Sequence, residues 1–364
     1  MQHSNYSFII ILTDWVKLKI KIKINMKESE KRNRKSFLHY VQNEIELLKL
    51  NGHYGVAKNR QSAFTCLRAY LLYIGKENIP FQKLNAQFVC GFEHWLLHVR
   101  GVCRNTSSFY IRSLQASFNK AVDDGLATGN PFTGVYRGVE KTRKRAVPPS
   151  VIRNLQGLDI RHHLHQLYQR EHRRDHGIYF EQTLQNLLFA RDLFVFSFCM
   201  RGMPFVDMAY LRKSDVRDGY ICYARRKTHQ QLAVRIEPPA QQILDRWHSK
   251  SAYLLPILTN TGKNGDTYED YRNMLTQYNR HLRVLGGFLG GIRLTSYVSR
   301  HSWATSARDI NIPLSVISQS LGHDSELTTR IYLQELDNSI IDRANSQLLN
   351  AVLKGKSKKI QGNV

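Results

Sequence analysis

The sequence predicts a mainly α-helical protein with a small β-sheet, divided into two domains. Apolar residues recur at helical spacing through most of residues 36–133 and again beyond about residue 184. Apolar and polar residues alternate, as in strands, on both sides of the segment RKTHQ at residues 226–230. A basic stretch with two prolines, residues 136–149, separates the two helical regions and predicts an interdomain linker.

These boundaries give five parts. They are a basic N-terminal extension (1–35), a helical domain (36–135), the basic linker (136–149), a mixed helix and strand domain (150–336) and a C-terminal helix with its tail (337–364).

Four helices are predicted in the first domain. They cover about 36–50 before Asn51-Gly52, about 57–74 before Gly75, a segment that begins after Asn85 as N-cap, and about 105–124 before Gly125. The fourth helix carries Arg112 and Lys120 on its surface. Four helices with a basic surface are typical either of a compact domain that binds nucleic acid or of an ordinary helical bundle.

The second domain is expected to form around one buried helix. Residues 184–200 are apolar nearly all round, which predicts a helix covered on every side. A β-hairpin over 220–236 then carries Lys227 at or near its turn and is closed by Pro238-Pro239. Further helices are predicted at about 240–249, at 267–285 with its end at Gly286-Gly287, from about Thr295, from Pro313 to Leu321 before Gly322, and at about 337–353.

The charge balance predicts a polyanionic partner. Lys and Arg number 53 against 29 Asp and Glu, so the formal net charge is +24. Such an excess repels itself unless a polyanion meets it, which makes nucleic acid the first candidate and an anionic membrane surface the second. No apolar run approaches the roughly 20 residues that span a bilayer. We expect no membrane partner. The expected location is the cytoplasm, in association with the bacterial nucleoid.

Cysteine and histidine usage does not indicate a metal site. Five cysteines are scattered without a CxxC motif, which fits a reducing cytoplasm. His172 and His176 have the i, i+4 spacing of a metal pair, but no third ligand is evident. A solvated basic helix or loop is the favoured interpretation of this segment, and we expect neither a metal nor a cofactor.

Two basic segments have open interpretations. Residues 17–24, KLKIKIKI, alternate with one basic face, and the N-terminus is either an arm on DNA or an unstructured extension with Met26 as an alternative start. In the linker, Arg143, Lys144 and Arg145 either follow a phosphate backbone or only join the domains.

Four side chains suggest phosphodiester chemistry. Arg201 follows the buried helix, where a buried guanidinium needs an anion, either Asp207 or a phosphate. Arg300, His323 and Tyr332 follow in YVSRHSWA, SLGHDS and TTRIYL. Two guanidiniums and an imidazole are suited to holding a phosphodiester, and a phenol whose anion they stabilise can attack phosphorus.

The order and spacing of these motifs resemble those of the tyrosine recombinases, the phage integrase family. RGMPFVDMAYL, the hairpin segment RKTHQ, YVSRHSWA, SLGHDS and IYL carry the resemblance, and NTSSFYIRSLQASFNKAV with GNPF extends it to the first domain. It covers roughly residues 36–350 and is strongest to forms from Bacteroides-type bacteria. It implies a helical, SAM-like core-binding domain and an α+β catalytic domain.

The resemblance also implies a role for each matched residue. Arg201 and Arg300 would clamp the scissile phosphate, Lys227 would protonate the 5′-oxygen leaving group, and His323 would donate a hydrogen bond to the phosphate. Tyr332 would form a 3′-phosphotyrosyl bond, which stores the energy of the broken phosphodiester, so rejoining needs neither ATP nor a metal.

One position departs from the family pattern. The family usually has histidine three residues before the second arginine, where this chain has Tyr297. Tyrosine can donate a hydrogen bond to phosphate but cannot become a cation near neutral pH. We include Tyr297 among the expected site residues. His301, next to Arg300, would point about 100° away from Arg300 on a helix and is not included.

The resulting prediction is a site-specific recombinase for integration, excision or inversion of a DNA segment. The resemblance implies a C-shaped clamp on duplex DNA with specific sites, a homotetramer on DNA and a monomer or weak oligomer when free. In the C-terminal helix, the stripe of Ile340, Ile341 and Leu348 suits packing either on a neighbouring protomer or within the same chain. The alternatives are a type IB topoisomerase-like enzyme and a basic DNA-binding protein without catalysis.

Overall fold

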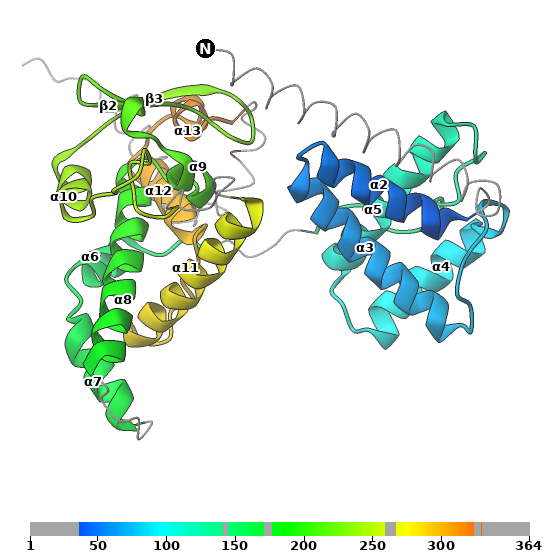
Figure 1. Cartoon of the computed structure of the whole chain (residues 1–364), viewed down its shortest axis with the longest axis horizontal. Coiled ribbons are helices and arrows are strands. Elements are labelled where there is room, and N and C mark those ends of the chain that lie inside the picture. The colour runs from blue at the N-terminus through cyan, green and yellow to red at the C-terminus, as the bar shows by residue number, and fades with distance from the viewer. Residues whose placement is uncertain (1–35, 141–144, 171–176, 259–266, 324–328, 330–364) are drawn as a thin grey trace, which may run out of the picture. The chain divides into compact units, whose positions relative to one another are not determined.

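The computed structural model describes residues 36–140, 145–170, 177–258, 267–323 and Thr329. The chain divides into two compact units, Met1–Thr142 and Arg143–Val364 (Figure 1). The N-terminal extension, the predicted C-terminal helix, the histidine pair of residues 172 and 176, two linker residues (Arg143 and Lys144) and Tyr332 lie outside the described residues.

The first unit contains the four predicted helices. They are α2 (Phe37–Leu50), α3 (Tyr54–Tyr73), α4 (Ala86–His94), which a π-helical turn (Trp95–Val99) continues, and α5 (Arg104–Asp123). The predicted N-cap is confirmed, because the Asn85 side chain accepts a hydrogen bond from the Phe88 amide at 2.9 Å. Helices α2, α3 and α5 pack on one another, and the Phe37, Phe118 and Phe132 rings meet edge to face in the core between them.

A buried carboxylate ties the three packed helices together. Glu44 of α2 is 6% exposed, and it accepts hydrogen bonds from Arg60 of α3 at 3.2 Å and from the Ser117 hydroxyl of α5. The Arg60 guanidinium also donates to the Ser113 carbonyl of α5. Removing one partner of such a buried pair leaves the other charge without compensation.

We therefore expect Glu44→Ala to lower the free energy of unfolding of this unit by about 3 kcal/mol. Glu46→Ala on the same helix is the matched control, because Glu46 forms only a surface ion pair with Lys49 at 2.9 Å and such pairs contribute about 0–1 kcal/mol. Urea unfolding of the two variants measures the difference. Equal losses would show that the buried network does not stabilise the unit.

The second unit is built around α8 (Gly177–Cys199). Five helices pack against it: α6 (Pro149–Gln156), α7 (Ile160–Arg170), α10 (Pro238–Arg246), α11 (Tyr268–Phe288) and α12 (Val298–Asp309) (Figure 1). The buried central helix is thus confirmed. Two short helices, α9 (Phe205–Tyr210) and α13 (Leu314–Leu321), complete the described α-helices of this unit.

A three-stranded antiparallel sheet carries the predicted hairpin. Strands β2 (Tyr220–Ala224) and β3 (Gln231–Arg235) pair with Cys222 opposite Ala233, and the short β1 (Val216–Arg217) adds a third strand on β2. The hairpin and the position of Lys227 in its turn are confirmed. Strand β1, with two residues, is too short to show an alternating pattern in the sequence.

Two predicted boundaries are wrong. Helix α11 continues through Gly286 and Gly287 to Phe288 instead of ending there. A Cβ on Gly286 would lie 1.9 Å from the Ile292 carbonyl oxygen, so this glycine permits a close approach of the returning chain within the helix. Likewise, Pro238 and Pro239 do not close the hairpin; they form the first turn of α10, where a missing amide costs nothing.

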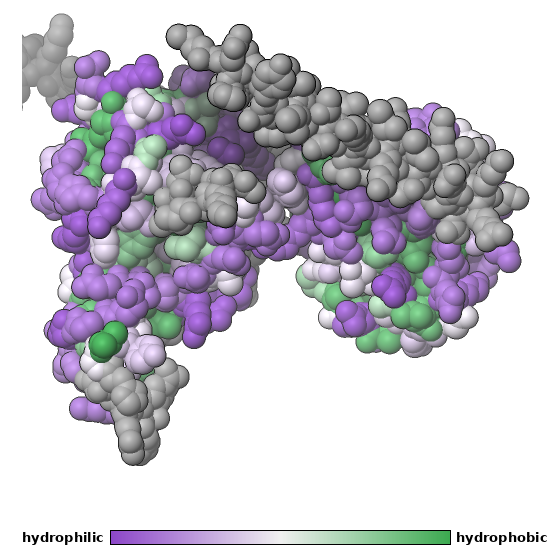
Figure 2. All heavy atoms as spheres, viewed as in Figure 1, coloured by the Kyte–Doolittle hydropathy of each residue, from purple (hydrophilic) through white to green (hydrophobic). Residues whose placement is uncertain are grey.

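The surface is predominantly hydrophilic on the face shown in Figure 2, with apolar residues scattered among polar ones. Among the helices that the structure describes, none is both long and apolar enough to cross a membrane.

Candidate functional site

The first predicted site residue, Arg201, lies in a left-handed turn that follows α8. Arg201 has φ 57° and Gly202 has φ 69°, and the turn is closed by hydrogen bonds from the Met203 amide to the Ser197 carbonyl and from the Ser197 hydroxyl back to the Met203 carbonyl. A non-glycine residue in this conformation costs about 1 kcal/mol or more. Such strain at a helix end, where glycine is usual, indicates that the side chain is needed at this position.

The second predicted arginine, Arg300, is buried beside that turn. It lies on α12, is 2% exposed, and donates hydrogen bonds to the Gly202 carbonyl at 2.9 Å and to the Leu321 carbonyl at 2.6 Å. A Cβ on Gly202 would lie 2.7 Å from the Arg300 Cα. Only glycine therefore allows the Arg201 turn to approach Arg300 this closely.

His323 is held between two partners. Its Nε2 lies 3.0 Å from the Arg300 Nη2 and its Nδ1 lies 2.8 Å from the Thr329 hydroxyl. A guanidinium can only donate, so we assign Nε2 as the acceptor and place the ring proton on Nδ1, which donates to Thr329. Burial, followed by the charges of Arg300, Arg225 and Lys227, lowers the pKa of His323 to about 4. The imidazole is therefore neutral at pH 7.

This low pKa makes the stability of the unit depend on pH. Between pH 6.5 and pH 4 the unfolded chain binds a proton at His323 that the folded unit does not, so acidification destabilises the fold. We expect the wild-type protein to lose about 1–3 kcal/mol more than His323→Gln between pH 7 and pH 4.5. Urea unfolding at several pH values measures this, with His248→Gln as the control for loss of an exposed imidazole. Parallel pH profiles for wild type and His323→Gln would contradict the assignment.

Lys227 lies in the exposed turn between β2 and β3. The turn is closed by hydrogen bonds between the backbone of Arg225 and the His229 amide at 2.7 Å and the Gln230 carbonyl at 2.9 Å. The Thr228 hydroxyl donates to the Gly322 carbonyl at 3.5 Å. These contacts place the Lys227 turn against the residue that precedes His323, in agreement with the effect of the Lys227 charge on the His323 pKa.

The arginines converge on the buried phenol of Tyr223. Burial, followed by the charge of Asp207, raises the pKa of Tyr223, and the guanidiniums of Arg300, Arg225 and Arg201 oppose this rise. The contact of Gly202 with Arg300 places the Arg201 turn in the same region of this unit. The structure thus brings together Arg201, Lys227, Arg300 and His323.

Asp207 does not neutralise Arg201, which was one interpretation of the sequence. Its carboxylate lies 3.7 Å from the Arg225 guanidinium and accepts a hydrogen bond from the Arg226 amide at 3.0 Å. Arg201 forms no ion pair within the described part of the chain.

The other predicted residues are placed as follows. Tyr297 precedes α12 and is 47% exposed, with its ring centroid 6.3 Å from that of His301. In the first unit, Arg112 and Lys120 are exposed on α5. Arg145 is exposed too. The roles of these residues and of Tyr332 stay predictions.

The sequence does not indicate Arg225 or Thr329 as site residues. Arg225 is an arginine beside another arginine, and its sequence neighbours do not distinguish it from a solvated residue. Thr329, which is fully buried, lies three residues before Tyr332, and that proximity was the only signal available for it.

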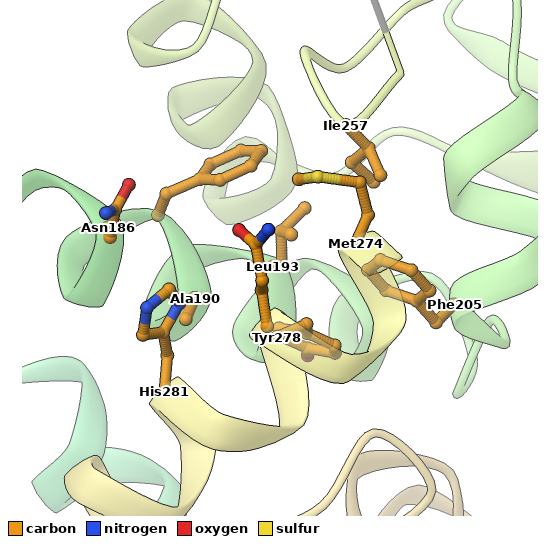
Figure 3. A pocket seen from close by; sticks show the side chains of 10 residues that line it. Asn186, Ala190, Leu193, Phe205, Ile257, Met274, Tyr278 and His281 are labelled. Carbon is orange, nitrogen blue, oxygen red and sulfur yellow. The ribbon is translucent and has the colours of Figure 1, made fainter. Parts of the chain in front are cut away.

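A small cavity elsewhere in this unit does not belong to the cationic site. It has a volume of about 40 Å³ and lies between α8 and α11, lined by Asn186, Leu193, Met274 and Tyr278 among others (Figure 3). None of the four clustered residues lines it. Among the described residues, no group of three or more His, Cys, Asp or Glu side chains is arranged to hold a metal ion.

Comparisons with known proteins identify the fold. Residues 36–141 match the family model of the phage integrase SAM-like domain. A lambda integrase dimer bound to a COC′ core site is similar over 81% of this chain and 94% of its own, at 13% identity and a TM-score of 0.56.

Two further structures have the same TM-score of 0.56. The Tn1549 transposon integrase in complex with a circular intermediate DNA is similar over 86% of this chain and 99% of its own, at 13% identity. A lambda integrase tetramer bound to a Holliday junction is similar over 87% and 86%, at 12% identity. The chain has the fold of the tyrosine recombinases. A comparison with curated protein sequences gives no match.

The tyrosine recombinase fold is mainly helical with one small antiparallel sheet, which confirms the fold class that the sequence predicts. The sequence identity to these structures is low, so the shared feature is the arrangement of the elements. Those elements carry Arg201, Lys227, Arg300 and His323 to one place in the second unit.

Proposed function

We propose that the protein is a site-specific tyrosine recombinase that cuts and rejoins duplex DNA through a 3′-phosphotyrosyl intermediate. The contact between Arg300 and His323 beside the strained Arg201 turn is the observation that carries this proposal. These residues form a cationic site. Within it, the Arg201 guanidinium pairs with no carboxylate of the described residues. Such a site fits a phosphodiester and its more highly charged transition state.

In this mechanism the Tyr332 oxygen attacks phosphorus and the bond from phosphorus to the 5′-oxygen breaks. Arg201 and Arg300 stabilise the pentacoordinate state, and the Lys227 ammonium gives its proton to the leaving 5′-oxygen. The phenol proton leaves to water. His323 is neutral before DNA binds and accepts from Arg300. A phosphate would raise its pKa, because a nearby anion favours the charged imidazolium that donates to phosphate oxygen.

The partners that we propose are duplex DNA with specific recombination sites and further copies of the same chain. Similar structures include an integrase dimer and an integrase tetramer on DNA, which supports a homotetramer on DNA and a monomer or weak oligomer when free. The basic residues Arg112, Lys120, Arg143, Lys144 and Arg145 would contact the DNA backbone. The protein would act on DNA in the cytoplasm, at the nucleoid of a Bacteroides-type bacterium, as an integrase or as an invertase.

A covalent adduct tests the proposal. Target duplexes are first selected from random DNA by binding to Tyr332→Phe, which keeps the DNA contacts but lacks the nucleophile. A nick is then placed next to the scissile position, so that the cut end diffuses away and rejoining stops. We expect wild-type protein to form a protein–DNA adduct that survives denaturant, and Tyr332→Phe to form none.

The control variant for this experiment is Tyr220→Phe, which alters an exposed tyrosine of β2 and should form the adduct at the wild-type rate. If the wild-type protein binds the selected DNA but forms no adduct, the protein is a DNA-binding protein without catalysis. If the adduct forms on random DNA as fast as on the selected target, it is a relaxing enzyme of the topoisomerase type.

A further inference from the structure

Arg225 is a buried arginine that neither substrate binding nor proton transfer uses in the proposed mechanism. It lies between the end of β2 and the Lys227 turn and is 5% exposed. Its Nη1 donates to the Leu321 carbonyl at 3.0 Å and to the Gly322 carbonyl. Both acceptors lie at the C-terminal end of α13, where helix carbonyls lack partners within the helix. Arg225 thus joins the hairpin to the segment that ends in His323.

The same side of the hairpin turn, before Lys227, is also anchored by Asp207 of α9. The Asp207 carboxylate is buried, lies 3.7 Å from the Arg225 Nε and accepts a hydrogen bond from the Arg226 amide at 3.0 Å. Two consecutive residues before Lys227 are therefore fixed by one carboxylate. Figure 1 shows α9, α13 and the hairpin at the same end of this unit, in agreement with these contacts.

The close fit extends to Gly322. This glycine is left-handed, with φ 64°, and a Cβ there would lie 2.5 Å from the Arg225 Cδ. The Leu321 carbonyl is shared, because Arg300 donates to it at 2.6 Å and Arg225 donates to it at 3.0 Å. One carbonyl therefore sets the distance between the hairpin and the helix that carries the phosphate-binding arginine.

We propose that Arg225 is a positioning residue for Lys227. It holds the hairpin turn against Leu321 and Gly322, and so places the Lys227 ammonium at the 5′-oxygen of a phosphate held by Arg300. This inference rests on the proposed function. It concerns only the step in which the phosphorus to 5′-oxygen bond breaks and the proton moves from Lys227 Nζ to that oxygen. Arg225 itself does not touch the DNA.

Lysine cannot replace Arg225 in this role. A single ammonium on a flexible chain cannot present the planar fork that reaches two adjacent carbonyls and a carboxylate together. It does keep a positive charge beside Asp207, so the buried carboxylate retains a counter-ion. A displacement of about 1 Å of a catalytic group is sufficient to slow a reaction about 10²-fold.

The chemistry of the leaving group provides a specific test. In a target whose 5′-oxygen is replaced by sulfur, the thiolate leaves without being protonated, because its conjugate acid has a far lower pKa than an alcohol. Cleavage of this substrate therefore does not need Lys227. We expect Arg225→Lys to cleave the ordinary target about 10–100-fold more slowly than wild type, and the sulfur target within about threefold of wild type. Lys227→Ala should show the same pattern. Arg235→Lys, on exposed β3, is the control and should cleave both targets normally.

Two results would overturn the proposal: an equal loss by Arg225→Lys on both targets, or no loss on either. If Arg225→Lys does not fold, as judged by its melting curve, Thr228→Val takes its place. That variant removes the contact from the half-exposed Thr228 to the Gly322 carbonyl. It should be several-fold slower than wild type on the ordinary target alone. An equal loss relative to wild type on both targets, or no loss on either, would refute the role of these contacts. Failure of the proposed function looks different, because wild type would then form no adduct with either target.

Discussion

Replacing Arg201 by glycine is expected to slow DNA-strand cleavage about 10²–10³-fold while the second unit becomes more stable. The loss of rate is that of removing one preorganised donor from a charged transition state. The gain in stability, about 1 kcal/mol, comes from relieving the left-handed conformation at φ 57°. Single-turnover formation of the covalent adduct measures the first effect, and urea unfolding measures the second.

Arg201→Ala separates the two effects, because alanine keeps the backbone strain and removes the guanidinium. It should cleave as slowly as Arg201→Gly without the gain in stability. Arg217→Ala, which removes an exposed arginine of β1, controls for the loss of one positive charge from the surface. If Arg201→Gly cleaves at the wild-type rate, the strained turn has no catalytic purpose and the phosphate lies elsewhere.

Most of the fold could be predicted from the sequence because its signals are local. Asn85 and Thr267 accept hydrogen bonds from the first turns of their helices, and Gly322 ends α13 in a left-handed conformation, as their residue types predict. The apolar surface of α8 predicts burial on all sides without reference to any other element. The alternating pattern on both sides of Lys227 predicts the hairpin in the same way.

Two of the errors concern contacts that spacing along the chain does not reveal. Gly286 interrupts the helical pattern in the sequence but not the helix, because its missing side chain admits the Ile292 carbonyl. Asp207 is six residues from Arg201 and eighteen from Arg225, yet it lies beside Arg225. Spacing along the chain cannot show which of two arginines forms an ion pair with a buried carboxylate. Here Arg225 is the partner because the hairpin packs against α9.

The candidate site was predictable as a set of residue types, but its support was not. Arg201, Arg300 and His323 could be named because their chemistry fits one reaction, and Lys227 because its hairpin segment resembles that of the tyrosine recombinases. The groups that hold them are mostly backbone carbonyls, those of Gly202, Leu321 and Gly322. Every residue has such a carbonyl, so the sequence does not mark the ones that bind a guanidinium.

Arg300→Lys is expected to abolish cleavage almost as completely as loss of the nucleophile, although it conserves the charge. In the structure, the Arg300 guanidinium bonds the Gly202 carbonyl, the Leu321 carbonyl and the His323 ring together. A lysine ammonium is a point charge and cannot span three acceptors in fixed directions. At least two buried acceptors would lose their donor. The Arg201 turn and His323 would then no longer be fixed relative to each other.

The expected losses are at least 10³-fold in single-turnover cleavage, since more than one donor of the transition state is displaced, and about 2–3 kcal/mol in the free energy of unfolding. Arg293→Lys, an exposed arginine just before α12, is the matched control. Combining Arg300→Lys with Arg201→Ala should add little further loss, because the two arginines act through one assembled site. Fully additive losses would mean that each guanidinium meets the phosphate independently, and the carbonyls between them would then have no role in catalysis.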